Sequence, residues 1–454
     1  MRLNSWWCYS GRAPQRKPGL LENLKRRMKI LKDLLELQKE NVISQETATS
    51  IIKYYESQKG NTTNRLILVF GILGAILIGL GLILILAHNW DELPRLLKTS
   101  LAFIPLIISQ GLCLYGLLKK QDNAVWVESS STLLFFTIGA SIALVAQIYN
   151  IPGNTASFLF TWMILSLPVI YLLRSSITAI LFVSGITYYA CHTGYWNYPS
   201  EGKIEYWALF AMVLPHYYLL YKNKPKSNFM TILNWLIPIS VIITLGTIGR
   251  SSEYILAIAY FSLFGLLYLI GDSEFFSSQS ARINGYKSLG ATGMISLLLI
   301  YSFDEFWEHL RRRDLIFSEI VATPEFVASI IISILALVLF IIQIKKESVK
   351  NIKPLSPLFL IFIMVFILGL FSNLSVVIIN LIVFSLGILT IKEGAKLDNL
   401  RILNHGLLLI TILVVCRFFD TDLSFILRGA LFVFVGIGFF ATNYWMLKKR
   451  KSNG

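Results

Sequence analysis

About 14 apolar stretches, each close to the length of one membrane crossing, fill the chain from Arg65 to Met446. The hydrocarbon core of a bilayer needs about 20 apolar residues for each helical crossing. Inside lipid, only helices and closed barrels satisfy their own backbone polar groups, and these runs are continuous rather than alternating. The sequence therefore predicts an all-α protein, a polytopic bundle of transmembrane helices.

The predicted spans follow one another through short polar connections. They are 65–87, 95–118, 131–149, 153–173, 175–191, 204–221, 229–249, 253–271, 286–303, 323–344, 355–372, 374–391, 403–419 and 423–446. We expect a disordered tail over residues 1–19, a cytoplasmic helical hairpin over 20–64, the transmembrane domain over 65–446 and a cytoplasmic tail over 447–454. Met28 begins a cleaner helix than the irregular basic sequence before it and is an alternative initiator.

The charge distribution supports this class of protein. Of the 454 residues, 55% are hydrophobic and 15% are charged, whereas soluble domains carry about 25% charged residues. The net charge of +15 would suit nucleic acid, but most basic residues lie between the spans or at the two ends. Lys and Arg are concentrated in alternate loops, which places both termini in the cytoplasm. Nucleic acid is therefore not an expected partner.

The segment before the first span reads as two short amphipathic helices. Leu24, Met28 and Leu31 recur at helical spacing in the first, and Ser44 stands where the second needs an N-cap. Such a hairpin is either a solvated juxtamembrane pair or a module that binds a cytoplasmic partner. Its basic face is also suited to anionic lipid head groups.

Two features concern helix packing. Gly71, Ala75 and Gly79 form a small-residue stripe on the first span, where another helix can approach closely. The basic triplet at 311–313 falls in the predicted outer loop 304–322, against the usual charge rule. An amphipathic helix lying in the outer interface explains the triplet, and so does a miscounted span.

Few charges enter the spans. No Asp or Glu lies in the central half of any predicted span. Arg428 is the deepest charge, about 9 Å from the outer end of its span at 1.5 Å per residue. A proton pump with a midplane carboxylate and a voltage sensor are both disfavoured.

Polar residues gather instead at the outer ends of the spans. If these ends converge, they form an outward-facing cup whose aromatic rings hold a sugar or an apolar chain and whose arginines hold an anion. The candidate ligand-binding residues are His88, Asn89, Trp90, Gln147, Tyr149, Asn150, Arg417, Asp420 and Arg428. Each has a structural alternative: an interfacial aromatic belt for Trp90 and Tyr149, a turn for Asn150, and an ion pair with Arg428 for Asp420.

No motif indicates catalysis, a metal site or a cofactor. His88, His216 and His405 cannot meet in one metal site under this topology, and no zincin, phosphate-loop or nucleophile-elbow pattern is present. The expected partners are membrane lipids, an amphiphilic or glycan-like ligand, and a cytoplasmic protein that meets the hairpin.

Several segments together resemble a known family. They are Val42-Ile43-Ser44, Ala87-His88-Asn89-Trp90, Gly139 to Tyr149, Trp162, Leu167-Pro168 and Leu172 to Ser175. Over roughly residues 30–220 the chain is similar to the bacterial predicted membrane proteins called domain of unknown function 2157. The stretch from Asn404 to Gly429 is similar to a tail common in the same proteins. The resemblance implies a bacterial inner-membrane protein and supplies no activity.

Three functional hypotheses remain open. The first is a transporter or lipid-handling protein that binds an amphiphile or envelope precursor in the outward cup. The second is a membrane-embedded glycosyl or acyl transferase at the outer face, with His88 or Asp420 as the base. The third is a non-catalytic scaffold or sensor that uses the cytoplasmic hairpin.

Overall fold

The computed structural model describes most of the helical chain. The described residues are 40, 44–57, 60–88, 93–196, 204–249, 254–277, 282–312, 317–346, 353–418 and scattered positions between 424 and 444. Within these ranges the structure is helical and contains no strand, as the sequence predicts.

The helices follow the predicted spans closely. They are α2 (Gln45–Ser57), α3 (Gly60–His88), α4 (Arg95–Lys119), α5 (Ala124–Ile148), α6 (Thr155–Leu172), α7 (Ser176–Gly194), α8 (Glu205–Asn223), α9 (Asn228–Leu245), η1 (Gly246–Ile248), α10 (Leu256–Asp272), α11 (Glu274–Ser277), α12 (Gly285–Ile300), α13 (Asp304–Arg311), α14 (Phe317–Val321), α15 (Pro324–Lys346), α16 (Leu358–Gly369), α17 (Leu374–Lys396) and α18 (Leu400–Phe418).

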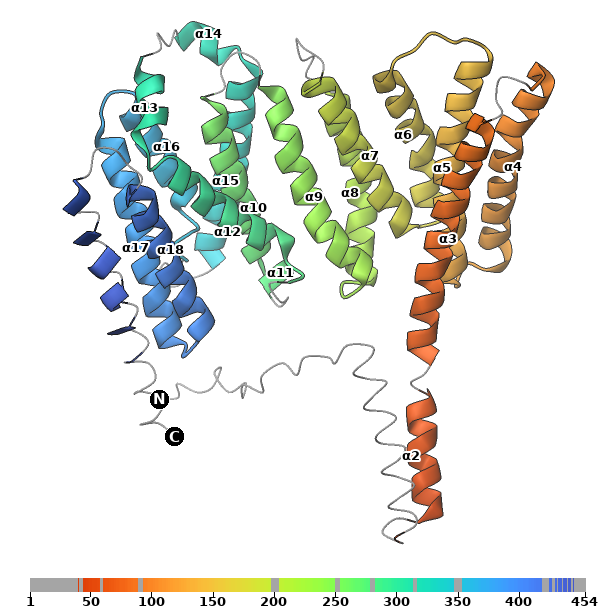
Figure 1. Ribbon diagram of the computed structural model, residues 1–454, viewed down its shortest axis with the longest axis horizontal. Helices are drawn as coiled ribbons and strands as arrows, with labels where there is room; N and C mark the ends of the chain where they lie inside the picture. Colours follow the sequence, from red (N-terminus) through yellow and green to blue (C-terminus); the bar gives the residue numbers. More distant parts are fainter. Residues whose placement is uncertain are drawn as a thin grey trace.

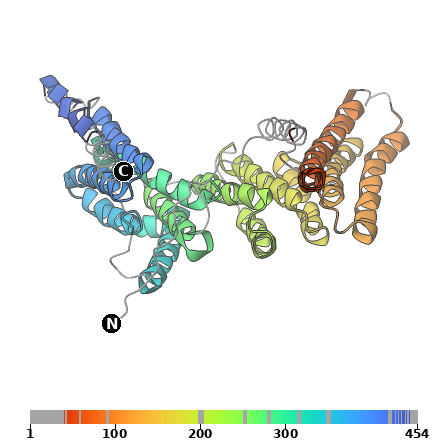
Figure 2. The same ribbon diagram turned by 90° about the horizontal axis from the view of Figure 1, so that it is seen from below.

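The long helices stand side by side in a row, with α3 to α6 at one end and α16 to α18 at the other (Figure 1). Seen from below, the row is elongated, and its two ends are far apart (Figure 2). Turns at 119–124, 173–176, 223–228, 272–285 and 396–400 lie along the lower edge in Figure 1. Turns at 148–155, 300–304 and 369–374 lie along the upper edge. The loops predicted to be cytoplasmic are those of the lower edge, and α2 lies beyond it.

Local sequence fixes where the helices begin. Asn123, Asn154, Ser175 and Ser227 each precede a helix and accept a hydrogen bond from a backbone N–H of its first turn. Such caps satisfy donors that the helix itself cannot. The predicted N-cap Ser44 is confirmed, because its Oγ accepts from the backbone N of Thr47 at 3.2 Å.

Fewer of the described helices are long and apolar enough to cross a membrane than the number of spans that the sequence predicts. Seven described helices are long and apolar enough to cross a membrane, or eight if the bent pair α12–α13 counts as one span. Helices α10 and α16, and the part of α3 from Ile67 to Gly81, are shorter apolar helices. Helices α7 and α8 coincide with predicted spans, but their Ser, Thr, Tyr and His side chains lower the mean hydropathy. The count of about 14 spans stays a prediction, as do the cytoplasmic hairpin and the last span, 423–446.

The small-residue stripe on the first span packs as predicted. Helix α3 contacts α5, and a Cβ on Gly71 would lie 2.8 Å from the Ser129 Oγ. A Cβ on Gly79 would lie 3.1 Å from the Phe136 Cβ, and Ala75 is buried between them. The close approach of α3 and α5 therefore depends on the absence of larger side chains here.

The C-terminal half has its own core. The rings of Phe261 and Phe362 stack with centroids 4.1 Å apart, tying α10 to α16. Helices α10 and α12 touch backbone to backbone at Gly290, where a Cβ would lie 2.7 Å from the Phe264 carbonyl oxygen and overlap the Tyr268 amide. No side chain fits at this crossing.

We expect Gly290→Ala to destabilise the protein by about 1–3 kcal/mol, because the added methyl group forces two backbones apart. The matched control is Gly111→Ala on α4, where a Cβ would meet nothing within 4 Å. Thermal unfolding of the purified protein in detergent measures both. Equal melting temperatures for the two variants would contradict this account of the crossing.

Candidate functional site

A bend at the upper edge creates the most distinctive surface feature. Helices α12 and α13 are bent by 71° across a short break. Trp307 and Leu310 of α13 are fully buried, whereas Glu308 and Arg312 on its other face are exposed. The amphipathic helix predicted within 304–322 is therefore present as α13. Trp307 packs where Gly369 has no side chain, and its Nε1 donates to the Tyr301 carbonyl oxygen at 2.8 Å.

An open hollow of about 470 Å³ lies at this bend. It lies between the start of α10, the end of α12 and one face of α13, and aromatic rings make up half of its lining residues. The lining residues are Tyr254, Ile300, Phe303, Glu305, Phe306 and His309. Ligand pockets of 300–1,000 Å³ with apolar walls and a few polar groups are typical small-molecule sites. We call this feature the upper hollow.

Two polar side chains give the upper hollow its chemistry. Glu305 and His309 are both exposed and lie one turn apart on α13. The His309 Nδ1–H donates to the Glu305 carbonyl oxygen at 2.7 Å, so Nε2 is the ring nitrogen left to act on a ligand. A carboxylate and an imidazole together can bond the hydroxyl groups of a bound molecule.

Arg417 adds positive charge beside the upper hollow. Its guanidinium lies 4.4 Å from the centroid of the Phe303 ring, which also lines the hollow. Its Nη2 donates to the Ser302 Oγ at 3.2 Å, and the Asn380 Nδ2 donates to the Ser302 carbonyl oxygen at 3.0 Å. These contacts join α18 and α17 to the bend between α12 and α13. Arg417 is thus one sequence-predicted site residue that lies beside a hollow.

The other predicted residues that the structure describes lie at the far end of the row. Gln147 is exposed at the end of α5, and the Tyr149 hydroxyl is 3.2 Å from the Thr99 Oγ1 of α4. Asn150 has a φ of 49° and forms the turn before α6, which confirms its structural alternative. His88 ends α3, with its side chain outside the described part, and Asn89, Trp90, Asp420 and Arg428 lie outside the described residues.

The structure does not bring these candidates into one cup. Helix α5 with Gln147 and Tyr149 stands near one end of the row, and α18 with Arg417 stands at the other (Figure 1). The cup required the outer ends of the spans to converge, and the described ends of α5 and α18 lie apart in the extended row. Because the side chains of the other candidates are not described, a cup among them stays a prediction. The upper hollow and the α4–α5 end are separate surfaces.

A buried carboxylate that the sequence analysis missed lies at the lower edge. Glu128, on α5, is almost fully buried and caps the first turn of α7. Its oxygens accept from the backbone N of Ser176 at 3.0 Å, the backbone N of Ile177 at 2.9 Å and the Ser175 Oγ at 2.6 Å. The predicted span began at residue 131, so Glu128 was counted outside it, whereas α5 begins at Ala124.

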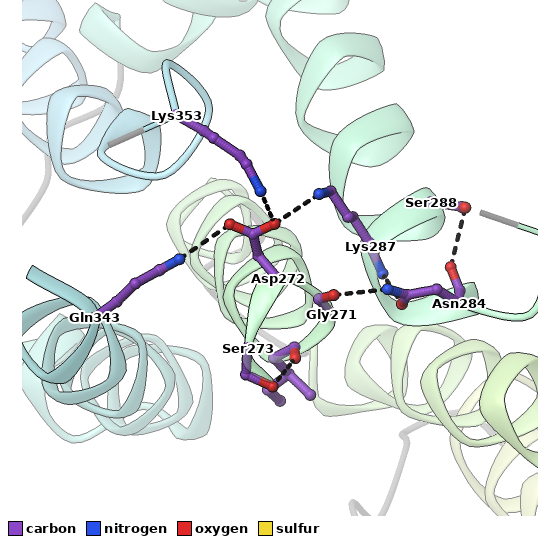
Figure 3. Close-up of polar contacts among 9 residues, drawn as sticks. Gly271, Asp272, Ser273, Asn284, Lys287, Ser288, Gln343 and Lys353 are labelled. Atoms are coloured by element: carbon purple, nitrogen blue, oxygen red, sulfur yellow. Dashed lines mark hydrogen bonds and ion pairs between the residues drawn. The ribbon is translucent and has the colours of Figure 1, made fainter. Parts of the chain in front are cut away.

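A second missed group surrounds Asp272 at the end of α10 (Figure 3). The Lys287 Nζ donates to its Oδ1 at 2.6 Å, Lys353 donates to the same oxygen, and the Gln343 Nε2 donates to Oδ2 at 3.0 Å. We call Asp272, Lys287, Gln343 and Lys353 the lower cluster. The sequence showed these residues only as separate charges at span ends, 15 to 81 positions apart.

The lower cluster favours the ionised form of its acid. Asp272 directly follows the predicted span 253–271, and its side chain is 2% exposed. Burial acts to raise the pKa of this carboxyl, but the hydrogen bonds and positive charges of the two lysines outweigh burial and hold the pKa below its ordinary value. The carboxylate is therefore a permanent negative charge at neutral pH.

Residue types that bind metal ions are dispersed in the part of the chain that the structure describes. There, no three His, Cys, Asp or Glu residues are grouped so that they could hold a metal ion. The three described cysteines, Cys113, Cys191 and Cys416, are free thiols on α4, α7 and α18.

Residues 35–179 match the family model described as predicted membrane protein (DUF2157). No curated protein and no solved structure matches the chain. The family match and the apolar helices together make this a membrane protein.

The DUF2157 match covers α2 to α6 and the start of α7. It is shorter than the resemblance seen in the sequence, which extended to about residue 220. The matched segment contains Glu128 and the α7 turn that it caps, whereas the upper hollow and the lower cluster lie beyond it. The family alone therefore explains neither of these two sites.

We expect Glu128→Gln to destabilise the DUF2157 segment by about 1–3 kcal/mol, because an amide cannot accept from three donors as a carboxylate does. Glu274→Gln is the matched control, since that side chain is 84% exposed and its ion pair with Lys346 is long, at 3.5 Å. Thermal unfolding in detergent measures both variants. If Glu274→Gln lowered the melting temperature as much as Glu128→Gln does, the result would contradict the role of Glu128 in capping α7.

Proposed function

We propose that this protein is a multi-pass inner-membrane protein that binds an amphiphile with a glycan-like or anionic head group in the upper hollow. In this proposal both termini lie in the cytoplasm and the upper edge faces outward. Binding there serves the transport or handling of a lipid or an envelope precursor. The observation that carries the proposal is an aromatic hollow with an acid and a histidine at the end of apolar helices.

The walls of the hollow suit an amphiphile. Tyr254, Phe303 and Phe306 offer ring faces on which a sugar ring or an acyl chain can lie. Glu305 and His309 are placed to bond hydroxyl groups, and Arg417 supplies a positive charge beside Phe303. A head group with hydroxyls and a negative charge would use all of these side chains.

The surroundings of the hollow suit the apolar tail of the same ligand. Ile300 lines the hollow and is 58% exposed at the end of α12. Helix α15 is the most apolar of the described helices long enough to cross a membrane, and only 11% of an apolar 18-residue stretch within it is buried inside the protein. An acyl chain leaving the hollow would therefore meet lipid-facing apolar surface rather than water.

The structure offers less support for the two alternative functions, the transferase and the scaffold or sensor. A transferase needs a base next to a nucleophile, and His309 bonds a backbone carbonyl oxygen rather than a side chain. The sequence-predicted bases His88 and Asp420, and residues 20–39 and 41–43 of the proposed partner-binding hairpin, lie outside the described side chains. No described contact favours either alternative over ligand binding.

Photocrosslinking in living cells tests the proposal even while the identity of the ligand is open. We expect Ile300→p-benzoylphenylalanine to capture an adduct whose mass spectrum shows a head group larger than those of bulk phospholipids. Adding Glu305→Gln and His309→Ala to this chain should reduce the adduct about tenfold, because two polar contacts are lost.

Matched controls come from the lower half of α18, away from the upper edge. Leu408 on α18 is 53% exposed and serves as the control crosslinking position. The His405 Nδ1 donates to the Arg401 carbonyl oxygen at 2.7 Å, the same contact as in His309, so His405→Ala is the control substitution. If Ile300 and Leu408 capture the same bulk lipids in the same ratio, the upper hollow is not a specific site.

A further inference from the structure

We infer that the lower cluster binds a phosphate-bearing anion, either the head group of an anionic phospholipid or free phosphate. This inference concerns the opposite edge of the protein from the upper hollow and does not depend on it. It rests on two accessible lysines held over one buried carboxylate.

The two lysine side chains of the lower cluster are partly exposed, whereas its carboxylate is buried. The Asp272 side chain is 2% exposed, whereas those of Lys287 and Lys353 are 38% and 45% exposed. The carboxylate therefore lies beneath the two ammonium groups and fixes their positions while they remain reachable (Figure 3). Positioned ammonium groups are well suited to phosphate, because little side-chain entropy is left to lose on binding.

The surrounding charge has the same sign. Lys345 and Lys346 end α15, and Arg282 precedes α12, so basic residues outnumber the acids Asp272 and Glu274 around the cluster. Basic pockets between transmembrane helices are a recognised way of holding phospholipid head groups. Four chain segments meet here: the ends of α10 and α15, the start of α12 and the chain before α16.

The cluster also offers an acceptor for a hydroxyl group. The Gln343 Nε2 is bonded to Asp272, and its Oε1 is buried with no hydrogen-bond partner in the described structure. Buried polar atoms without a partner are rare in folded proteins. A glycerol hydroxyl of phosphatidylglycerol, or the O–H of a protonated phosphate, would satisfy this oxygen.

Native mass spectrometry of the full chain in neutral detergent tests the inference. The probes are dioleoyl phosphatidylglycerol, dioleoyl phosphatidylcholine and inorganic phosphate. We expect preferential binding of phosphatidylglycerol over phosphatidylcholine, and about fivefold weaker binding for Lys287→Gln and for Lys353→Gln, the loss of one lysine contact near a membrane surface. If inorganic phosphate displaces the lipid at equal concentration, free phosphate is the ligand; if it does not, the head group is.

Three further variants separate binding from folding. Lys120→Gln removes an exposed lysine at the same edge, outside the cluster, and should leave the affinity within about twofold. Lys353→Arg keeps the charge and should also leave it within about twofold. Asp272→Asn removes the charge that fixes the two ammonium groups and should weaken phosphatidylglycerol binding about fivefold, as the loss of one lysine does.

Two results would overturn the inference. One is equal affinity for phosphatidylglycerol in Lys353→Gln and Lys120→Gln, with no response to inorganic phosphate. The other is unchanged phosphatidylglycerol binding by an Asp272→Asn variant that elutes as a monodisperse peak. Lys353 is half-exposed and lies before α16, so its variants keep the test valid even if Asp272→Asn does not fold.

Discussion

A backbone inside lipid has to satisfy every one of its own polar groups, and this constraint explains where the polar chemistry of this protein is found. The long helices bond internally along their length, so caps, turns and charges are confined to the two edges of the row. Asn123, Asn154 and Ser175 cap helices there, and Glu128 reaches from α5 to cap α7. The two candidate sites lie at these edges as well. Between the edges, the helices pack through apolar side chains, through glycines such as Gly290, and through a few hydrogen bonds between small polar side chains, as between Ser109 and Thr137.

The two sites differ because their edges are built differently. At the upper edge, the bend between α12 and α13 turns a short helix sideways, and the angle leaves a hollow walled by aromatic rings. At the lower edge, several helix ends approach one another, and one buried carboxylate holds two lysines together. A hollow walled by aromatic rings can select a ligand by its shape, whereas a pair of ammonium groups selects a ligand by its negative charge. The protein thus presents different binding chemistry at its two edges.

Local signals in the sequence predicted local structure well. The run of apolar stretches predicted the helices, Ser44 predicted a cap, and Gly71 and Gly79 predicted a close crossing. The basic triplet at 311–313 predicted an amphipathic helix within 304–322, which is present as α13. Contacts between distant residues could not be predicted in this way. Asp272 meets Lys353 81 positions later, and no pattern in the sequence states that α10 ends beside the start of α16. The same holds for the single outer cup, since the sequence does not say which helices are neighbours.

The central claim is that the two edges of the row lie on opposite sides of a membrane. Single cysteines at Asp122 and Lys224 on the lower edge, and at Asn150 and Glu308 on the upper edge, test it in a chain whose native cysteines are replaced. A membrane-impermeant maleimide added to intact cells should label the two upper positions and reach the two lower ones only after the membrane is permeabilised. Labelling of Asp122 and Asn150 to the same extent in intact cells would contradict the account.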